Sequence, residues 1–215
     1  MSNGASAAPP ANLRRVESPA ASTLVGLTAK FEDLQTVLKC CERLVSELAA
    51  DGEPDDVTIE AVWTVALLSY GRCFSTTGTD GTALTEDDLT GALSNTDVLD
   101  WHKVLLQLRD HHGDPAINPR EQFSVGVSQN ADGTANGIAL TSARQPLVDD
   151  LTVRQTGAIA FALSGLVNDR IAAQQGKVFG ELQDASKEDL DELDLLDVAE
   201  PELPPDQGAE QPPVQ

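Results

Sequence analysis

Residues 109–112 place an arginine, an aspartate and two histidines in consecutive positions, and they are the chain's best candidates for chemistry. Imidazole titrates near neutral pH and guanidinium keeps its charge, so the set combines a proton acceptor with a fixed cation. Cleavage of RNA through its own 2′-hydroxyl needs a base to take that proton and a cation to stabilise the phosphorane-like charge. The candidate catalytic residues are therefore Arg109, His111 and His112.

The same residues also have a purely structural interpretation, which we favour. Helical residues two positions apart do not face each other, so Arg109 and His111 diverge, whereas His112 can share a face with Arg109. Histidines in the last turn of a helix complement its dipole without any catalytic duty. Arg109 and Asp110 can pair with neighbours or contribute to a dimer interface. His102, seven residues before Arg109, is expected to be a partly buried packing residue.

No other motif predicts a metal site or a cofactor. The three cysteines, Cys40, Cys41 and Cys73, form no CxxC pair and are expected to be reduced and structural. The acidic residues between 80 and 88 lack the ligand order of an EF-hand, and the glycines beside them lack the lysine of a P-loop. Arg72 lies on an apolar helix and is expected to pair with an acid from another helix.

Composition predicts one domain with tails in a chain of 215 residues. Hydrophobic residues make up 40%, but only 4% are aromatic, so Leu, Val, Ala and Ile must fill the core. The longest strongly apolar run, residues 61–70, is far shorter than the roughly 20 residues that cross a bilayer. The N-terminal segment lacks the apolar stretch of a secretory signal. We therefore expect a cytoplasmic protein that has no membrane partner.

The formal net charge of −21 is unevenly distributed. Residues 181–215 hold twelve acids and one lysine, which gives −11 and leaves −10 for residues 1–180. Such a chain repels nucleic acid and anionic membranes, and it has no basic cluster, so we expect no DNA partner. We expect RNA as a partner only if the candidate catalytic residues form an RNA-cleaving pocket at a dimer interface. The acidic tail could bind a basic protein partner or simply increase solubility.

Helical periodicity predicts α-helices over most of the chain. Apolar residues recur every three or four positions over about 22–50, with Ser22 as the expected N-cap, and over about 56–74, which is apolar nearly all round. A short helix is expected over 85–93, with Thr85 as its N-cap, and the next should run from 95 or 96 to about 112. The last long helix should cover about 152–183, where three glycines indicate either close packing or a kink.

The pattern changes to period two at about residue 122. Phe123, Val125 and Val127 alternate with small or polar residues, residues 130–133 form a turn, and residues 134–143 can return as a second strand. The expected architecture is an all-α helical bundle over 22–182 with a β-hairpin inserted at about 122–143. A disordered arm over 1–21 and a disordered acidic, Pro-rich tail over 183–215, with at most a transient turn at 190–198, should flank it.

The order of these elements and several local sequences resemble HEPN-type helical domains, in particular a group of uncharacterised bacterial members. The matching sequences are ALLSYGRCFSTTG at 66–78, WHKVLLQLRDHHGDPAINPREQ at 101–122, the following hairpin and the final long helix. The resemblance covers about residues 22–182. It implies a HEPN-like bundle that forms a homodimer.

Active HEPN ribonucleases carry an arginine, usually followed by a polar residue, with a histidine four to six positions further on, and dimerisation brings two such motifs around RNA. Here Arg109 and Asp110 match the first half, but Asp114 and Pro115 stand five and six residues on, and both candidate histidines lie too near. The resemblance therefore implies a degenerate motif. We expect a non-catalytic helical module that acts through self-association or a protein partner. The alternative is a metal-independent endoribonuclease, in a toxin or phage-defence setting, that uses Arg109 with His111 or His112.

Overall fold

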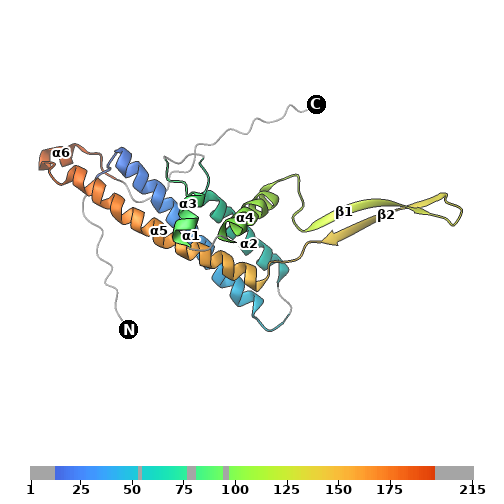
Figure 1. Ribbon diagram of the computed structural model, residues 1–215. Helices are drawn as coiled ribbons and strands as arrows, with labels where there is room; N and C mark the ends of the chain where they lie inside the picture. The colour runs from blue at the N-terminus through green and yellow to red at the C-terminus, as the bar shows by residue number, and fades with distance from the viewer. Residues whose placement is uncertain (1–12, 53–54, 77–80, 94–96, 197–215) are drawn as a thin grey trace, which may run out of the picture.

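The computed structural model is mostly helical and has one small antiparallel sheet, and it describes residues 13–52, 55–76, 81–93 and 97–196. Two long helices, α1 (Pro19–Leu48) and α5 (Asp150–Leu182), lie side by side along the length of the molecule (Figure 1). Helix α2 (Asp56–Cys73) packs on α1, and α4 (Asp97–Gly113) packs on α2. The short helix α3 (Glu86–Ala92) contacts α4 and α5. The predicted helical bundle with an inserted hairpin is confirmed at this level.

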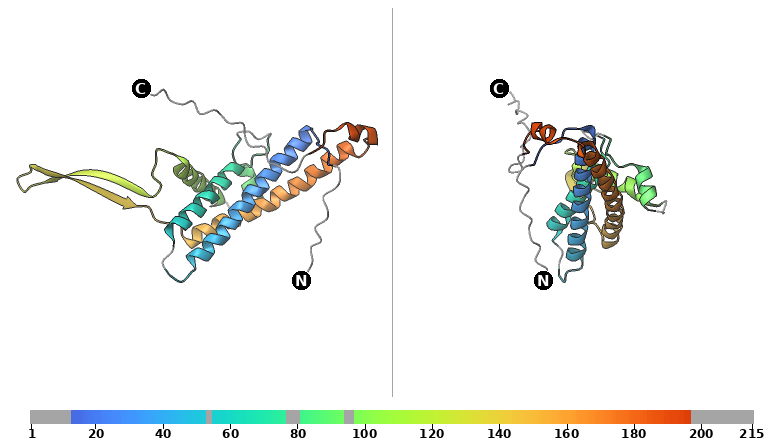
Figure 2. Two further views of the ribbon diagram at one scale, coloured as in Figure 1. Left: turned by 180° about the vertical axis from the view of Figure 1, so that it is seen from behind. Right: turned by 90° about the vertical axis from the view of Figure 1, so that its left-hand side faces the viewer.

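The hairpin extends away from the bundle (Figure 2). Strands β1 (Glu121–Gln129) and β2 (Ala135–Arg144) pair antiparallel, and Val125 stands opposite Leu140 at the centre of the ladder. The turn is closed by a hydrogen bond from the Gly133 N–H to the Asn130 carbonyl, 2.9 Å long. Gly133 has φ +85°, in the left-handed region that favours glycine. The predicted turn and strand pairing are both confirmed.

The core lies where α1, α2, α4 and α5 meet. Its fully buried side chains come from all four helices and are mainly aliphatic: Leu34, Leu44, Ile59, Leu67, Tyr70, Leu105, Leu163 and Val167. Close helix packing does not require the three glycines predicted to mark it on α5: a Cβ at Gly157 would make an ordinary van der Waals contact of 3.4 Å with the Cys41 Cβ on α1, and a Cβ at Gly165 or Gly176 would meet no atom within 4 Å. No described helix is both long enough and apolar enough to cross a bilayer.

Polar side chains fix where the helices begin. The Asp55 carboxylate accepts from the Val57 and Thr58 N–H groups at the start of α2, and Asp149 accepts from Thr152 at the start of α5. Thr85 and Asp88 form a reciprocal capping box on α3, as the sequence suggested. The predicted partner of Arg72 is also present, because Asp33 on α1 binds its guanidinium at 2.5 Å.

Two predicted boundaries were wrong. Helix α1 begins at Pro19 with Ser18 as its N-cap, so residues 13–21 are not part of a disordered arm; residues 1–12 of that arm lie outside the described residues. The acidic segment forms a sixth helix, α6 (Lys187–Glu192), because Ser186 and Asp189 make a second capping box. A bridge between Arg14 and Leu195 joins the two ends of the described chain. The predicted tail beyond residue 196 lies outside the described residues.

Candidate functional site

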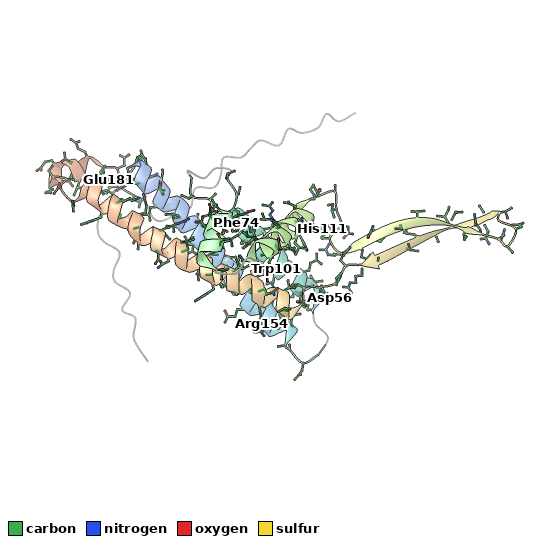
Figure 3. All side chains as sticks on the ribbon, viewed as in Figure 1. Asp56, Phe74, Trp101, His111, Arg154 and Glu181 are labelled. Carbon is green, nitrogen blue, oxygen red and sulfur yellow. The ribbon has the colours of Figure 1, made fainter. Side chains whose placement is uncertain are left out.

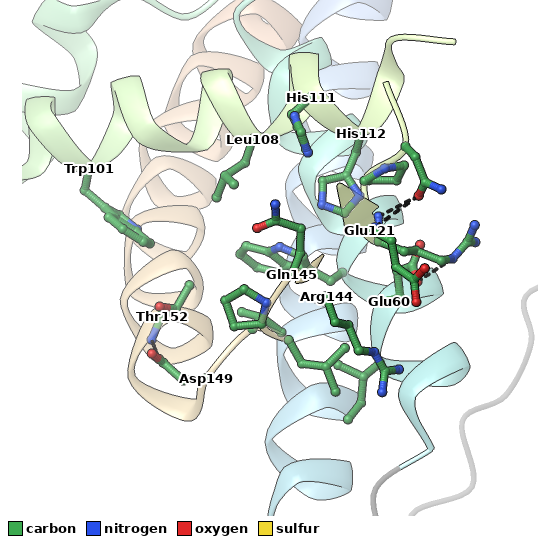
Figure 4. A pocket seen from close by; sticks show the side chains of 18 residues that line it. Glu60, Trp101, Leu108, His111, His112, Glu121, Arg144, Gln145, Asp149 and Thr152 are labelled. Carbon is green, nitrogen blue, oxygen red and sulfur yellow. Dashed lines mark hydrogen bonds and ion pairs between the residues drawn. The ribbon is translucent and has the colours of Figure 1, made fainter. Parts of the chain in front are cut away.

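A cavity of about 570 Å³ lies between α2, α4, the root of the hairpin and the start of α5 (Figure 4). The hairpin root consists of residues 118–121 and 144–149, the two segments that join the strands to the helices. The cavity is the size of a small-molecule site, and both apolar and polar side chains line it. Its lining includes the ionisable and aromatic residues Glu60, Trp63, Trp101, His111, His112, Arg120 and Arg144.

The last turn of α4 directs both candidate histidines to this cavity. The His112 Nδ1 lies 3.1 Å from the Thr64 hydroxyl, and the His111 and His112 rings meet edge-on with centroids 6.1 Å apart. Burial lowers the pKa of His112 below its ordinary value, and the neighbouring His111 lowers it further. His112 is therefore neutral near pH 7, which leaves it a hydrogen-bonding group and a base in principle.

Arg109 does not join the two histidines. Its guanidinium binds the adjacent Asp110 at 2.6 Å, and its side chain is absent from the described residues that line the cavity. The Arg109 side chain lies on α2 instead, where a Cβ at Gly71 would clash with the Arg109 Cδ. The glycine is what allows this close approach. The structure therefore brings His111 and His112 together but keeps the predicted cation apart from them.

The cavity contains two arginines that the sequence analysis missed as site residues. Arg120 binds Glu60 at 2.8 Å, and Arg144 binds Asp56. Both ion pairs join the hairpin root to α2. Figure 3 shows Asp56 at the end of the bundle near the hairpin and Glu181 at the opposite end. No spacing rule could reveal them, because Arg144 is 88 positions from its partner in the sequence. Since each guanidinium already has a carboxylate, a phosphate would have to compete for it.

His102 has the packing role that the sequence predicted. It is 4% exposed, its Nδ1 lies 2.8 Å from the Tyr70 hydroxyl, and its ring packs on Phe74 at 4.3 Å between centroids. Burial lowers the pKa of this imidazole, and its effect outweighs that of Glu86, which raises the pKa, while Lys103 adds a smaller lowering. His102 therefore stays neutral in the folded chain at pH values where an exposed histidine is already protonated.

The lowered pKa of His102 predicts a pH-dependent stability. Below its pKa of about 6.5, the imidazole of the unfolded chain is protonated, whereas that of the folded chain is still neutral. The free energy of unfolding is therefore highest above about pH 6.5 and falls as the pH drops toward the pKa of the folded state. We expect urea denaturation to give a lower free energy of unfolding at about pH 5.5 than at about pH 7.5. His102→Gln should flatten this dependence, with the remainder due to His112. Equal slopes in the two proteins would contradict the assignment.

The three cysteines are free. Burial raises the pKa of Cys41 and of Cys73 to about 12, and it also raises the pKa of the half-buried Cys40. A thiol with so high a pKa is a poor nucleophile, because the thiolate is the reactive form. Within the described residues, no three side chains among His, Cys, Asp and Glu are placed to hold a metal ion.

A second candidate site is the apolar face of the hairpin, defined as Phe123, Val125, Val127, Ile138 and Leu140. Directly paired residues lie on the same side of a two-stranded ribbon, so the register puts all five side chains on one face. Each is between 54% and 76% exposed. The opposite face holds only small or polar residues, among them Ser124 and Thr141. The sequence predicted the strands but not that their apolar side would be uncovered.

Comparison with known proteins adds no relative: the chain matches no family model, no curated protein and no solved structure. The HEPN-type resemblance is therefore carried by the quoted segments alone. A function has to be argued from the two sites just described, the cavity and the apolar face of the hairpin.

Proposed function

We propose that this chain is a non-catalytic, HEPN-like helical module of the cytoplasm that acts by self-association through its hairpin. The observation that carries the proposal is the exposure of all five side chains of the apolar face. An isolated two-stranded hairpin is at best marginally stable in water, and an uncovered apolar strand pair invites association. A hairpin of this length is best explained by a surface that covers it.

Burial of the apolar face provides enough free energy for two copies to associate. Burying each partly exposed Val, Ile, Leu or Phe contributes about 1–2 kcal/mol. Two hairpins that cover each other would gain on the order of 10–20 kcal/mol by the same estimate. Association costs about 4–15 kcal/mol in lost freedom, so the apolar face can supply most of the net affinity.

Charge permits a second copy as the occupant of the hairpin, although it opposes contact elsewhere between two copies. Each chain carries −21, so two copies repel each other wherever their acidic surfaces meet. The segment from Gln122 to Ala143 contains a single ionisable residue, Asp132, at the turn. The hairpin is thus an uncharged surface on which two acidic chains can meet. A two-fold interface uses the same patch on both subunits, and the apolar face is complementary to itself in this sense.

Co-purification of two tagged copies tests this function. A chain with an affinity tag and a chain with a different tag are expressed together, and we expect the affinity step to retain both. The matched control is a pair in which both copies carry Val127→Asp, which places a charge on the apolar face and should abolish co-purification. Retention of only the affinity-tagged wild-type chain would contradict self-association.

The competing function is an endoribonuclease, and the two imidazoles at the cavity are the observation in its favour. It requires Arg109 to leave Asp110 and α2 and to reach the same phosphate as His111 or His112. We expect no cleavage when the purified chain is incubated with a mixed RNA pool. Cleavage that is lost in both Arg109→Ala and His112→Ala would replace the proposed function with this one.

A further inference from the structure

We infer that the hairpins of two copies pack apolar face to apolar face and run in opposite directions, around a two-fold axis that passes over Val125 and Leu140. This inference rests on the proposed self-association and specifies its geometry. The axis position follows from the register. The paired positions on the apolar side run from Glu121–Arg144 at the root to Gln129–Ala135 near the tip, and Val125–Leu140 is the middle one.

This arrangement sets Phe123 and Ile138 against smaller side chains, and identical side chains meet at the axis. A two-fold axis between the faces places β1 over β1 of the second copy with the direction reversed. Val125 then meets Val125 of the second copy, and Phe123 meets Val127. On β2, Leu140 meets Leu140, and Ile138 meets the small Ser142. Stacked sheets are separated by about 10 Å, and such alternation lets their side chains interdigitate across that space.

Opposite directions also suit the charges. A strand of nine residues is about 30 Å long, so reversed hairpins keep the two acidic bundles at opposite ends, beyond a Debye length of about 8 Å. Parallel hairpins would bring the bundles together. Reversal further places Asp132, at the tip, near the hairpin root of the second copy, where the side chains of Arg120 and Arg144 are about two thirds exposed.

Cysteine cross-linking tests the axis position in the full chain. Val125→Cys should cross-link to itself in the presence of a short bifunctional maleimide, because the two thiols face each other across the axis. Ser124→Cys is the matched control, since its side chain lies on the opposite face of the same strand. The native thiols give little background, because Cys41 and Cys73 are buried and Cys40 is half-buried.

We expect the cross-linked fraction to be about tenfold or more higher for Val125→Cys than for Ser124→Cys, because the paired thiols react at a raised effective concentration. Equal fractions in chains that sediment as dimers would overturn the geometry and leave the proposed function standing. In a mixture of the two variants, cross-links that form only between a Val125→Cys chain and a Leu140→Cys chain would overturn the inferred geometry in favour of parallel hairpins. Chains that remain monomeric would overturn both proposals.

Discussion

Leu140→Asp is expected to convert the dimer into a monomer. The substitution places two carboxylates over each other at the inferred axis and removes the burial of two leucines, each worth about 1–2 kcal/mol. Desolvating the paired charges adds to this loss. The dissociation constant should therefore rise by roughly a thousandfold, about 4 kcal/mol, in sedimentation velocity over a range of concentrations.

The matched control for Leu140→Asp is Thr141→Asp. It adds the same charge one residue away, on the opposite face of β2, so it should change the dissociation constant little. Thr141→Asp should unfold at the wild-type urea midpoint, and Leu140→Asp should match the wild-type chain measured at concentrations below its dissociation constant, because the strands contribute nothing to the buried core. Equal weakening by both variants would show that charge alone, rather than the apolar face, governs association.

Leu163→Ala is expected to destabilise the fold far more than Phe161→Ala, although the second substitution removes more atoms. Both residues lie on α5, but Leu163 is 0% exposed in the core and Phe161 is 73% exposed. A cavity left by a buried leucine costs about 2–5 kcal/mol, whereas truncation of an exposed side chain changes the free energy of unfolding by about 0.5 kcal/mol. Urea denaturation measures both.

The same pair of variants also tests which surface associates. Neither substitution touches the hairpin, so Phe161→Ala should leave the dissociation constant of the dimer unchanged. Loss of the dimer in Phe161→Ala would place the interface on α5 and contradict the role given to the apolar face. A similar free energy of unfolding for the two variants would contradict the position of the core.

The sequence was sufficient for the parts of the fold that depend on local patterns. The period-two alternation from Phe123 and the turn ending at Gly133 are local signals, and both were interpreted correctly. Helix α1 began earlier than predicted because two serines compete as N-caps, and Pro19 at the first helical position favours Ser18 over Ser22. The prediction weighed the apolar periodicity and overlooked that proline.

The acidic segment shows how composition can mislead. Its acidic, Pro-rich composition predicted disorder after residue 182, yet Ser186 and Asp189 form a capping box that starts α6. The capping-box pattern was present in the sequence, but the prediction relied on the high negative charge of the segment instead. The contact of Arg14 with the carbonyl of Leu193, 2.7 Å long, joins residues 179 positions apart and could not be inferred from any local pattern.

The candidate site was only partly predictable. Helix geometry correctly indicated that Arg109 and His111 diverge, since they are two residues apart. It also suggested a shared face for Arg109 and His112, but Arg109 lies against α2 at Gly71 whereas His112 faces the cavity. The cavity itself depends on Arg120 and Arg144, which the tertiary fold alone brings to α2.

Sedimentation equilibrium of the wild-type chain at several concentrations tests self-association most directly. We expect a molar mass that approaches twice the 22.7 kDa of one chain as the concentration rises, at near-physiological ionic strength. A mass that stays at 22.7 kDa up to the highest concentration would contradict the proposed function and leave the apolar face of the hairpin without its second copy.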